Sequence, residues 1–129
     1  MPYSSDTLVA NDDHFIRPFT SLNGRFILLV QSDGNMCIYK DSQLKVAEWQ
    51  SHTAGKGGYR LLMQTDGNLV LYKADIKEQS PANAVWSTGT YKGGPGNRGV
   101  GAKAVLTNEG NLVVLDGSGK TIWSSKDNQ

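Results

Sequence analysis

Polar residues of four types recur at a fixed spacing in two parts of this chain. The two sets are Gln31, Asp33, Asn35 and Tyr39, and Gln64, Asp66, Asn68 and Tyr72. A carboxylate accepts hydrogen bonds, an amide donates and accepts them, and a phenol does both. A site that offers one hydroxyl group both a donor and an acceptor distinguishes an axial from an equatorial position, because an unpaired polar group costs about 1–3 kcal/mol. The set therefore suits a neutral polyol such as a sugar.

These sets belong to a unit that occurs three times. Two close copies span residues 31–39 and 64–72, and a divergent copy spans residues 107–115. Each copy is followed by a tryptophan in a similar context, namely Trp49, Trp86 or Trp123. Internal repetition of this kind predicts three equivalent sheets, each too small to bury its own face, packed around a shared axis. The three indoles are predicted to fill the middle of that core, and sugar stacking by one of them is the minor alternative.

Composition and length are those of an ordinary globular domain. The 129 residues predict one domain over residues 1–129. Thirteen basic and twelve acidic residues give a net charge of +1, without the basic stripe of a nucleic-acid-binding protein. No apolar run has the length of a membrane span, so we expect neither nucleic-acid binding nor membrane insertion. A single cysteine excludes an internal disulfide. Together with a start that lacks the pattern of a signal peptide, this predicts a cytoplasmic or non-classically secreted protein.

The pattern of apolar residues is that of an all-β protein. Short apolar runs at residues 26–30, 69–72 and 112–115 lie between Gly and Asn residues, and the turn spacing predicts about twelve short strands. The extra length between units, at residues 75–83 and 89–101, is predicted to form surface loops.

The turn inside each unit decides which side chains share a face. A two-residue loop at residues 33–34 would put Gln31 and Asn35 on opposite faces. A three-residue loop at residues 32–34 would pair Gln31 with Asn35, and it needs a left-handed residue, usually glycine, in third place. All three units have glycine there, namely Gly34, Gly67 and Gly110. We therefore predict the three-residue loop.

Alternation along the strands then gives each unit two different faces. In the first unit one face, called here the front face, has Gln31, Asn35, Cys37 and Tyr39, with Asp33 at its rim. The opposite face has only apolar residues in all three units and is predicted to pack into the core. Turn chemistry alone would explain Asp, Gly and Asn in a single copy. It does not explain Gln and Tyr at fixed offsets in two copies.

No pattern in the chain indicates catalysis or metal binding. A glycosidase needs two carboxylates on either side of one bond, and each unit offers one exposed carboxylate. His14 and His52 have no cysteine or paired carboxylate at metal-ligand spacing. The G-x-G-x-x-G match at residues 94–99 contains a proline and precedes no helix, so a loop is predicted. We expect a protein that is not an enzyme and has no metal or cofactor.

The pattern Gln-x-Asp-x-Asn-x-Val-x-Tyr resembles the signature of the bulb-type, or monocot-type, mannose-binding lectins. Residues 64–72 match it in full, and residues 31–39 match it except that Cys37 replaces the usual Val. With the three tryptophan repeats, the resemblance covers nearly the whole chain. It implies a β-prism II fold, in which three four-stranded antiparallel sheets have pseudo-threefold symmetry and one carbohydrate site each.

The resemblance also implies a role for each residue of a metal-independent, non-catalytic mannose site. Asp66 and Asn68 would bind the axial O2 of mannose, Gln64 would bind O3, Tyr72 would bind O4, and Val70 would contact the C3–C4 face. The same roles, in this order, would fall to Asp33, Asn35, Gln31, Tyr39 and Cys37. The third unit is predicted to be a weak or degenerate site, and its residues are Thr107, Glu109, Asn111, Val113 and Leu115.

The resemblance further implies mannose and mannose-containing glycans as partners, and a homodimer formed by exchange of the C-terminal strand near residues 121–125. The alternative is a protein-interaction module that keeps the lectin scaffold, as in bacteriocin-like or cytoskeleton-associated proteins. The intact front-face residues of two units argue against this alternative.

Overall fold

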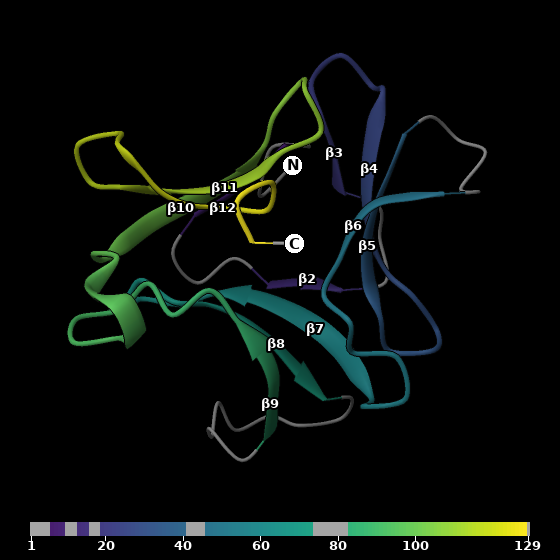
Figure 1. Cartoon of the computed structure of the whole chain (residues 1–129), viewed down its shortest axis with the longest axis horizontal. Helices are drawn as coiled ribbons and strands as arrows, with labels where there is room; N and C mark the ends of the chain where they lie inside the picture. The colour runs from purple at the N-terminus through teal and green to yellow at the C-terminus, as the bar shows by residue number, and fades with distance from the viewer. Residues whose placement is uncertain (1–5, 10–12, 16–18, 41–45, 74–82, 129) are drawn as a thin grey trace.

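Twelve strands form three antiparallel four-stranded sheets around a common axis (Figure 1). The computed structural model describes residues 6–9, 13–15, 19–40, 46–73 and 83–128, and the strands are counted within these ranges. Sheet I contains, in spatial order, β3 (Phe19–Thr20), β4 (Phe26–Val30), β5 (Met36–Lys40) and β6 (Ala47–Gln50). Sheet II contains β2 (Asp13–Phe15), β7 (Gly58–Met63), β8 (Leu69–Lys73) and β9 (Ala84–Ser87). Sheet III contains β1 (Thr7–Val9), β10 (Gly101–Leu106), β11 (Leu112–Asp116) and β12 (Thr121–Ser124). The β-prism II prediction is confirmed.

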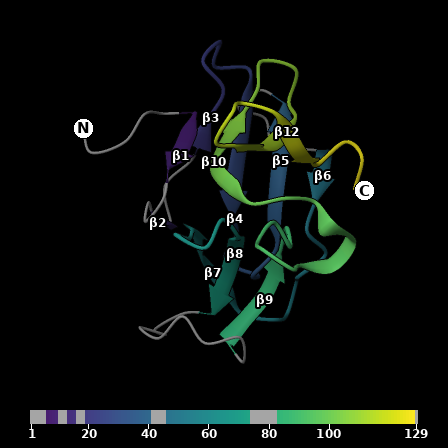
Figure 2. The ribbon, with the colours of Figure 1, turned by 90° about the vertical axis from the view of Figure 1, so that its left-hand side faces the viewer.

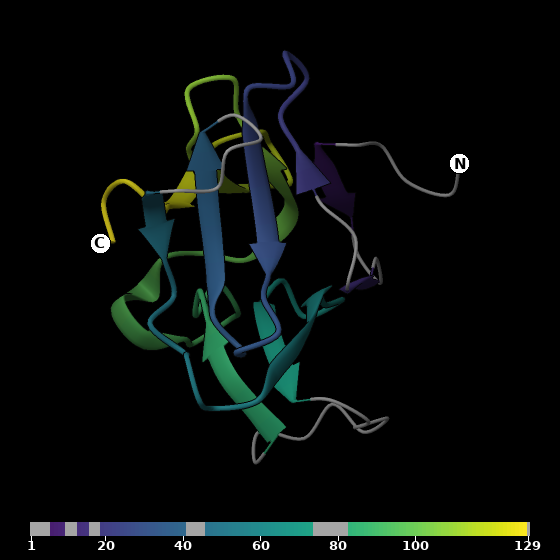
Figure 3. The same ribbon diagram turned by 90° about the vertical axis from the view of Figure 1, so that its right-hand side faces the viewer.

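The first twenty residues supply one edge strand to each sheet in turn. β1 pairs with β10 of sheet III, β2 with β7 of sheet II and β3 with β4 of sheet I. The other three strands of each sheet are consecutive in sequence and correspond to one repeat. Figures 2 and 3 view this arrangement from two sides, and β4 and β5 lie side by side across sheet I in Figure 3.

Each repeat has the predicted three-residue hairpin loop. In the first repeat the amide of Gln31 donates to the Asn35 carbonyl (2.8 Å), and the amide of Gly34 donates to the Gln31 carbonyl (2.9 Å). Gly34 has a φ of 89°, the left-handed region that an L side chain rarely adopts. Equivalent bonds close the turns at residues 64–68 and 107–111.

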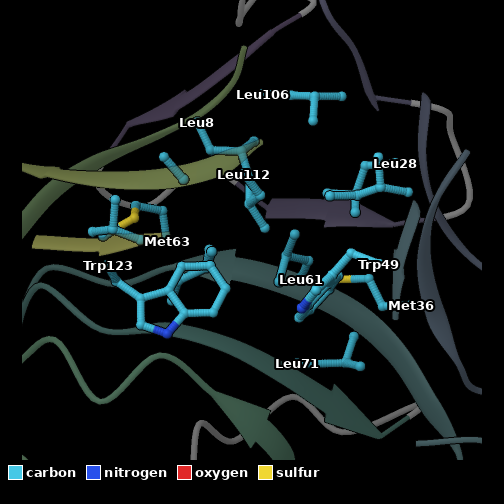
Figure 4. Close-up of a cluster of buried hydrophobic side chains, with 14 of the residues drawn as sticks. Leu8, Leu28, Met36, Trp49, Leu61, Met63, Leu71, Leu106, Leu112 and Trp123 are labelled. Atoms are coloured by element: carbon cyan, nitrogen blue, oxygen red, sulfur yellow. The ribbon is translucent and has the colours of Figure 1, made fainter. Parts of the chain in front are cut away.

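The apolar faces of the three sheets meet in one core (Figure 4). Its members include Met36 and Ile38 from β5, and their equivalents in β8 and β11, all with no exposed surface. The three tryptophans pack against one another, with ring centroids 5.5–6.0 Å apart and interplanar angles of 69–85°. Edge-to-face packing of this kind stabilises aromatic clusters beyond their buried area. Trp49 and Trp123 are buried in this core as predicted, whereas Trp86 packs against it and is only partly buried.

The three hairpin loops interlock the sheets in a cycle. The loop of Gly34 packs on the start of β7, and the loop of Gly67 packs on the start of β10. The loop of Gly110 packs on the ring of Phe26 in β4. A Cβ atom on Gly67 would lie 2.7 Å from the amide nitrogen of Gly101, which is closer than real Cβ contacts. Glycine is therefore required at these positions for close approach as well as for backbone conformation.

Two longer connections lie between the repeats. Residues 89–101 run mostly over the surface, as predicted, and include a single 3₁₀ turn, η2 (Pro95–Asn97). Most of the predicted surface loop at residues 75–83 lies outside the described residues. At the C-terminal end, β12 pairs with β11 of the same chain. In the described part of the chain, no helix is both long and apolar enough to cross a membrane.

Candidate functional site

The asparagine of each repeat has a structural role that the sequence did not indicate. The side-chain oxygen of Asn35 accepts from the amide of Thr53 (3.1 Å), and that of Asn111 accepts from the amide of Lys126 (3.0 Å). The oxygen of Asn68 accepts from the amides of Gly89 (2.9 Å) and Thr90 (3.3 Å). In each repeat the oxygen thereby anchors the segment that follows the strand containing the tryptophan, which is β6, β9 or β12. Because the oxygen receives these N–H groups, the nitrogen of each amide is left for other partners.

Site 2, the front face of sheet II, contains a linked polar network. Asp66 accepts from the backbone amide of Asn68 (2.9 Å) and from the side-chain amide of Gln64 (3.1 Å), both at Oδ1. The hydroxyl of Tyr72 donates to Oε1 of Gln64. Within the described residues, neither the second oxygen of Asp66 nor the side-chain nitrogen of Asn68 makes a hydrogen bond. An acceptor and a donor that the described residues leave unbonded therefore belong to the same site.

A pocket of about 390 Å³ lies over this network. All five predicted residues of the second unit line it, together with Ala84, Ser87 and Tyr91. The last three residues were not predicted from the sequence. Ala84 and Ser87 line the pocket because β9 pairs with β8. Tyr91 lines it because Asn68 anchors the neighbouring residue, Thr90. Val70 is 3% exposed and packs with Leu62, which makes the floor of the pocket apolar.

The phenol of Tyr72 is a stable hydrogen-bond donor. Burial, and secondly the negative charge of Asp66, raise the pKa of Tyr72 above its usual value. Both effects disfavour the phenolate. The hydroxyl therefore stays protonated over the physiological pH range and can donate to a neighbouring acceptor while its oxygen accepts.

Site 1, the front face of sheet I, brings the predicted residues of the first unit together but connects them differently. Asp33 accepts from the backbone amide of Asn35 (2.9 Å), as in site 2. The Asn35 side-chain nitrogen donates to Oε1 of Gln50 (2.9 Å) and to the sulfur of Cys37 (3.3 Å). The Cys37 thiol in turn donates to Oε1 of Gln31 (2.8 Å).

Burial is the largest influence on the pKa of Cys37 and on that of Tyr39. It raises the pKa of the Cys37 thiol, which is 2% exposed, and it also raises the pKa of Tyr39. Cys37 is the one cysteine of the chain and is not part of a disulfide. A buried thiol with a raised pKa is a poor nucleophile. Cys37 therefore occupies the position of Val70 in site 2 as an unreactive thiol that, unlike valine, is hydrogen-bonded to Gln31 and Asn35.

Site 3, the front face of sheet III, has lost most of the polar set. Thr107 takes over the capping of the turn, because its hydroxyl accepts from the amides of Asn111 (3.2 Å) and Glu109 (3.4 Å). Glu109 is exposed, and Leu115 is half-buried in the place of the phenol. Among the described residues there is no group of three His, Cys, Asp or Glu residues that could hold a metal ion.

Solved structures identify the family. The structure resembles a lectin from Marasmius oreades, with a TM-score of 0.74 and 31% identity over 96% of this chain and 92% of that one. It also resembles monomeric monocot mannose-binding lectins from Gastrodia elata, with a TM-score of 0.70 and 30% identity over 93% of this chain and 96% of that one. The chain belongs to the bulb-type mannose-binding lectin family.

A third bulb-type lectin shows the same architecture with a sugar bound. The mannose-specific agglutinin from snowdrop (Galanthus nivalis) bulbs, solved with methyl-α-D-mannoside, has a TM-score of 0.62 and 25% identity over 84% of this chain and 87% of that one. No protein-family model matches the sequence of this bulb-type domain, and no curated protein matches it. The family is therefore established through three-dimensional structure.

Proposed function

We propose that this domain is a metal-independent, non-catalytic lectin that binds terminal mannose or mannose-rich glycans through its front faces. The observation that carries the proposal is the pocket of site 2, in which the second carboxylate oxygen of Asp66 and the amide nitrogen of Asn68 make no hydrogen bond to any of the described residues. One hydroxyl group can donate to the first and accept from the second. This dual contact selects the axial O2 of mannose over the equatorial O2 of glucose, because a misplaced hydroxyl leaves both partners unpaired.

The remaining residues of site 2 complete the recognition of one sugar. Gln64 contacts O3 with an amide hydrogen, and the oxygen of Tyr72 accepts from O4. Their mutual hydrogen bond holds both side chains in place before the sugar arrives, which reduces the entropy lost on binding. Val70 provides the apolar surface for the C3–C4 face. Tyr91, at the wall of the pocket, adds a ring beside the sugar.

Site 1 binds the same sugar through Gln31, Asp33, Asn35, Cys37 and Tyr39. Site 3 is expected to be weak or silent, because Leu115 cannot bond O4 and Thr107 already caps its turn. Each site buries few sugar atoms, so a single site should bind a monosaccharide in roughly the millimolar range. Useful affinity for a mannose-rich glycan then comes from several sites acting together.

The decisive experiment is calorimetric titration with methyl α-mannoside, and separately with methyl α-glucoside, in the presence of EDTA. We expect saturable heat with the mannoside, much weaker binding of the glucoside, and no effect of the chelator. The variant Asp33→Ala/Asp66→Ala should show no binding. Its near-UV circular dichroism spectrum, which reports the packing of the tryptophans, should be the same as that of the wild type. A folded wild-type protein that gives no heat with any mannoside would refute the proposal.

Assembly into a homodimer by exchange of β12 would bring further sites together. In such a dimer, β12 of each chain would make with the partner's β11 the pairing that it makes here within its own chain. The Gastrodia elata lectins, by contrast, are described as monomeric. Light scattering coupled to size exclusion decides the matter, and the mass of a single chain at high protein concentration would exclude the exchange.

A further inference from the structure

The residue that follows the tryptophan differs among the three sheets. Strand pairing sets Gln50 opposite Cys37 in sheet I, and Ser87 opposite Val70 in sheet II. The equivalent position in sheet III is Ser124. Because directly paired residues of neighbouring strands point to the same face, all three side chains project onto the front face. Site 1 therefore has a long amide where the other two sites have a short hydroxyl.

The length of Gln50 allows it to bond a residue of the binding motif. Its Oε1 accepts from the Asn35 side-chain nitrogen at 2.9 Å, and the second hydrogen of that nitrogen faces the sulfur of Cys37 at 3.3 Å. An amide nitrogen has two hydrogens. The amide cannot turn over to free one, because its oxygen accepts from the amide of Thr53. Both donors of Asn35 are therefore used within the protein.

Site 2 lacks this internal competitor. Ser87 lines the pocket but makes no hydrogen bond to the Asn68 nitrogen, which has no partner among the described residues. The Asn68 oxygen is anchored as in site 1. The two sites thus differ in whether the amide donor that should meet the sugar is already engaged.

We propose that Gln50 is an affinity-determining residue of site 1, where its side chain competes with the sugar hydroxyl for the Asn35 amide. Site 2 is then the primary binding site of the domain, and site 1 binds only after Gln50 has moved away. Gln50 is exposed, so the movement requires no unfolding. This inference rests on the proposed mannose-binding function and adds an order of affinity to its sites.

Separate measurements on the two sites test the inference. Asp66→Ala leaves site 1 as the complete site, and Asp33→Ala leaves site 2. Titration with methyl α-mannoside should show that the affinity of site 1 is about three- to tenfold lower than that of site 2. This difference corresponds to the loss of one hydrogen bond. Adding Gln50→Ser to Asp66→Ala should strengthen site 1 by about the same factor. Adding Ser87→Gln to Asp33→Ala should weaken site 2 by about the same factor.

Two controls separate this effect from a general one. Glu48→Ser shortens another exposed side chain of β6 and should leave site 1 unchanged. The side-chain NH₂ signals of Asn35 in a nitrogen–proton spectrum should shift and lose exchange protection in Gln50→Ser, without any sugar present. This readout reports the Gln50–Asn35 contact independently of binding.

The outcomes distinguish the two proposals. Equal affinities of sites 1 and 2, or no gain on adding Gln50→Ser, would overturn the role of Gln50 and leave the lectin function standing. No binding by wild-type protein or by any variant would overturn the lectin function and the inference with it. A gain in the Gln50→Ser variant and a loss in the Ser87→Gln variant would establish both.

Discussion

Replacement of Gly67 by alanine tests the claim that the hairpin loops interlock the three sheets. The change has two separate costs. The backbone has a φ of 94°, and an L residue in the left-handed region costs about 1–2 kcal/mol. The new methyl group would also lie 2.6 Å from a side-chain carbon of Val100 and 2.7 Å from the amide nitrogen of Gly101. Forcing a methyl group into a packed contact costs about 1–3 kcal/mol.

Gly119→Ala is the matched control. Gly119 occupies the same place in a three-residue hairpin loop between β11 and β12 and has a φ of 89°. A Cβ atom there would have no neighbour within 4 Å. The control variant therefore has the backbone cost alone, about 1–2 kcal/mol. Gly67→Ala should lose a further 1–3 kcal/mol, roughly, from the free energy of unfolding.

Guanidinium unfolding followed by tryptophan fluorescence measures both variants, because the indoles sit where the three sheets meet. A lower midpoint for Gly67→Ala, at an unchanged slope, is the expected result. Equal losses in the two variants, within about 0.5 kcal/mol, would refute the reasoning, because the contact between sheets II and III would then contribute nothing beyond the backbone term.

Three further measurements check other parts of the structure. Asn111→Ala should lower the free energy of unfolding by about 0.5–1.5 kcal/mol, because the Lys126 amide and the Ser125 hydroxyl lose their shared acceptor; its mannoside affinity should not change, and a stability equal to wild type would contradict the anchoring role. Cys37 should react with iodoacetamide at least about tenfold more slowly in the folded than in the guanidinium-unfolded protein, because it is buried with a raised pKa; equal rates by mass spectrometry would show an accessible thiol. The pKa of Tyr72 is raised by burial and by Asp66. The stability linked to its protonated form is thus fully present below its unfolded value of about 10 and is lost as pH rises through the folded value. Unfolding measured from pH 8 to 11 should show this decline, and it should be smaller in Tyr72→Phe.

Local sequence rules were sufficient for each hairpin. The glycine in third place of the loop requires a left-handed conformation, and that requirement fixes the pairing of Gln31 with Asn35. Once this pair is fixed, strict alternation assigns every other side chain of the two strands to the front or to the core. The faces could therefore be predicted from the sequence, and the structure agrees with them.

The register of the last strand of each repeat, which is β6, β9 or β12, could not be predicted from such rules. In sheet I the register shifts between Ile38 and Tyr39, whose partners are Trp49 and Ala47. A bulge of this kind changes which residues lie on the front face, and no short sequence pattern predicts it. The contact of Gln50 with Asn35 depends on the register of β6 in sheet I. The place of Ser87 in the pocket of site 2 depends in the same way on the register of β9 in sheet II.

The sequence by itself determined the three repeats, their hairpins and the polar set on two front faces, because these depend on residues within ten positions of one another. Only the tertiary structure decided which polar atoms are left free for a ligand. The amide of Asn35 and that of Asn68 are the same chemical group in the same motif, yet the first is engaged by Gln50 and the second is not. The difference arises from a residue fifteen positions away, which strand pairing brings within 2.9 Å.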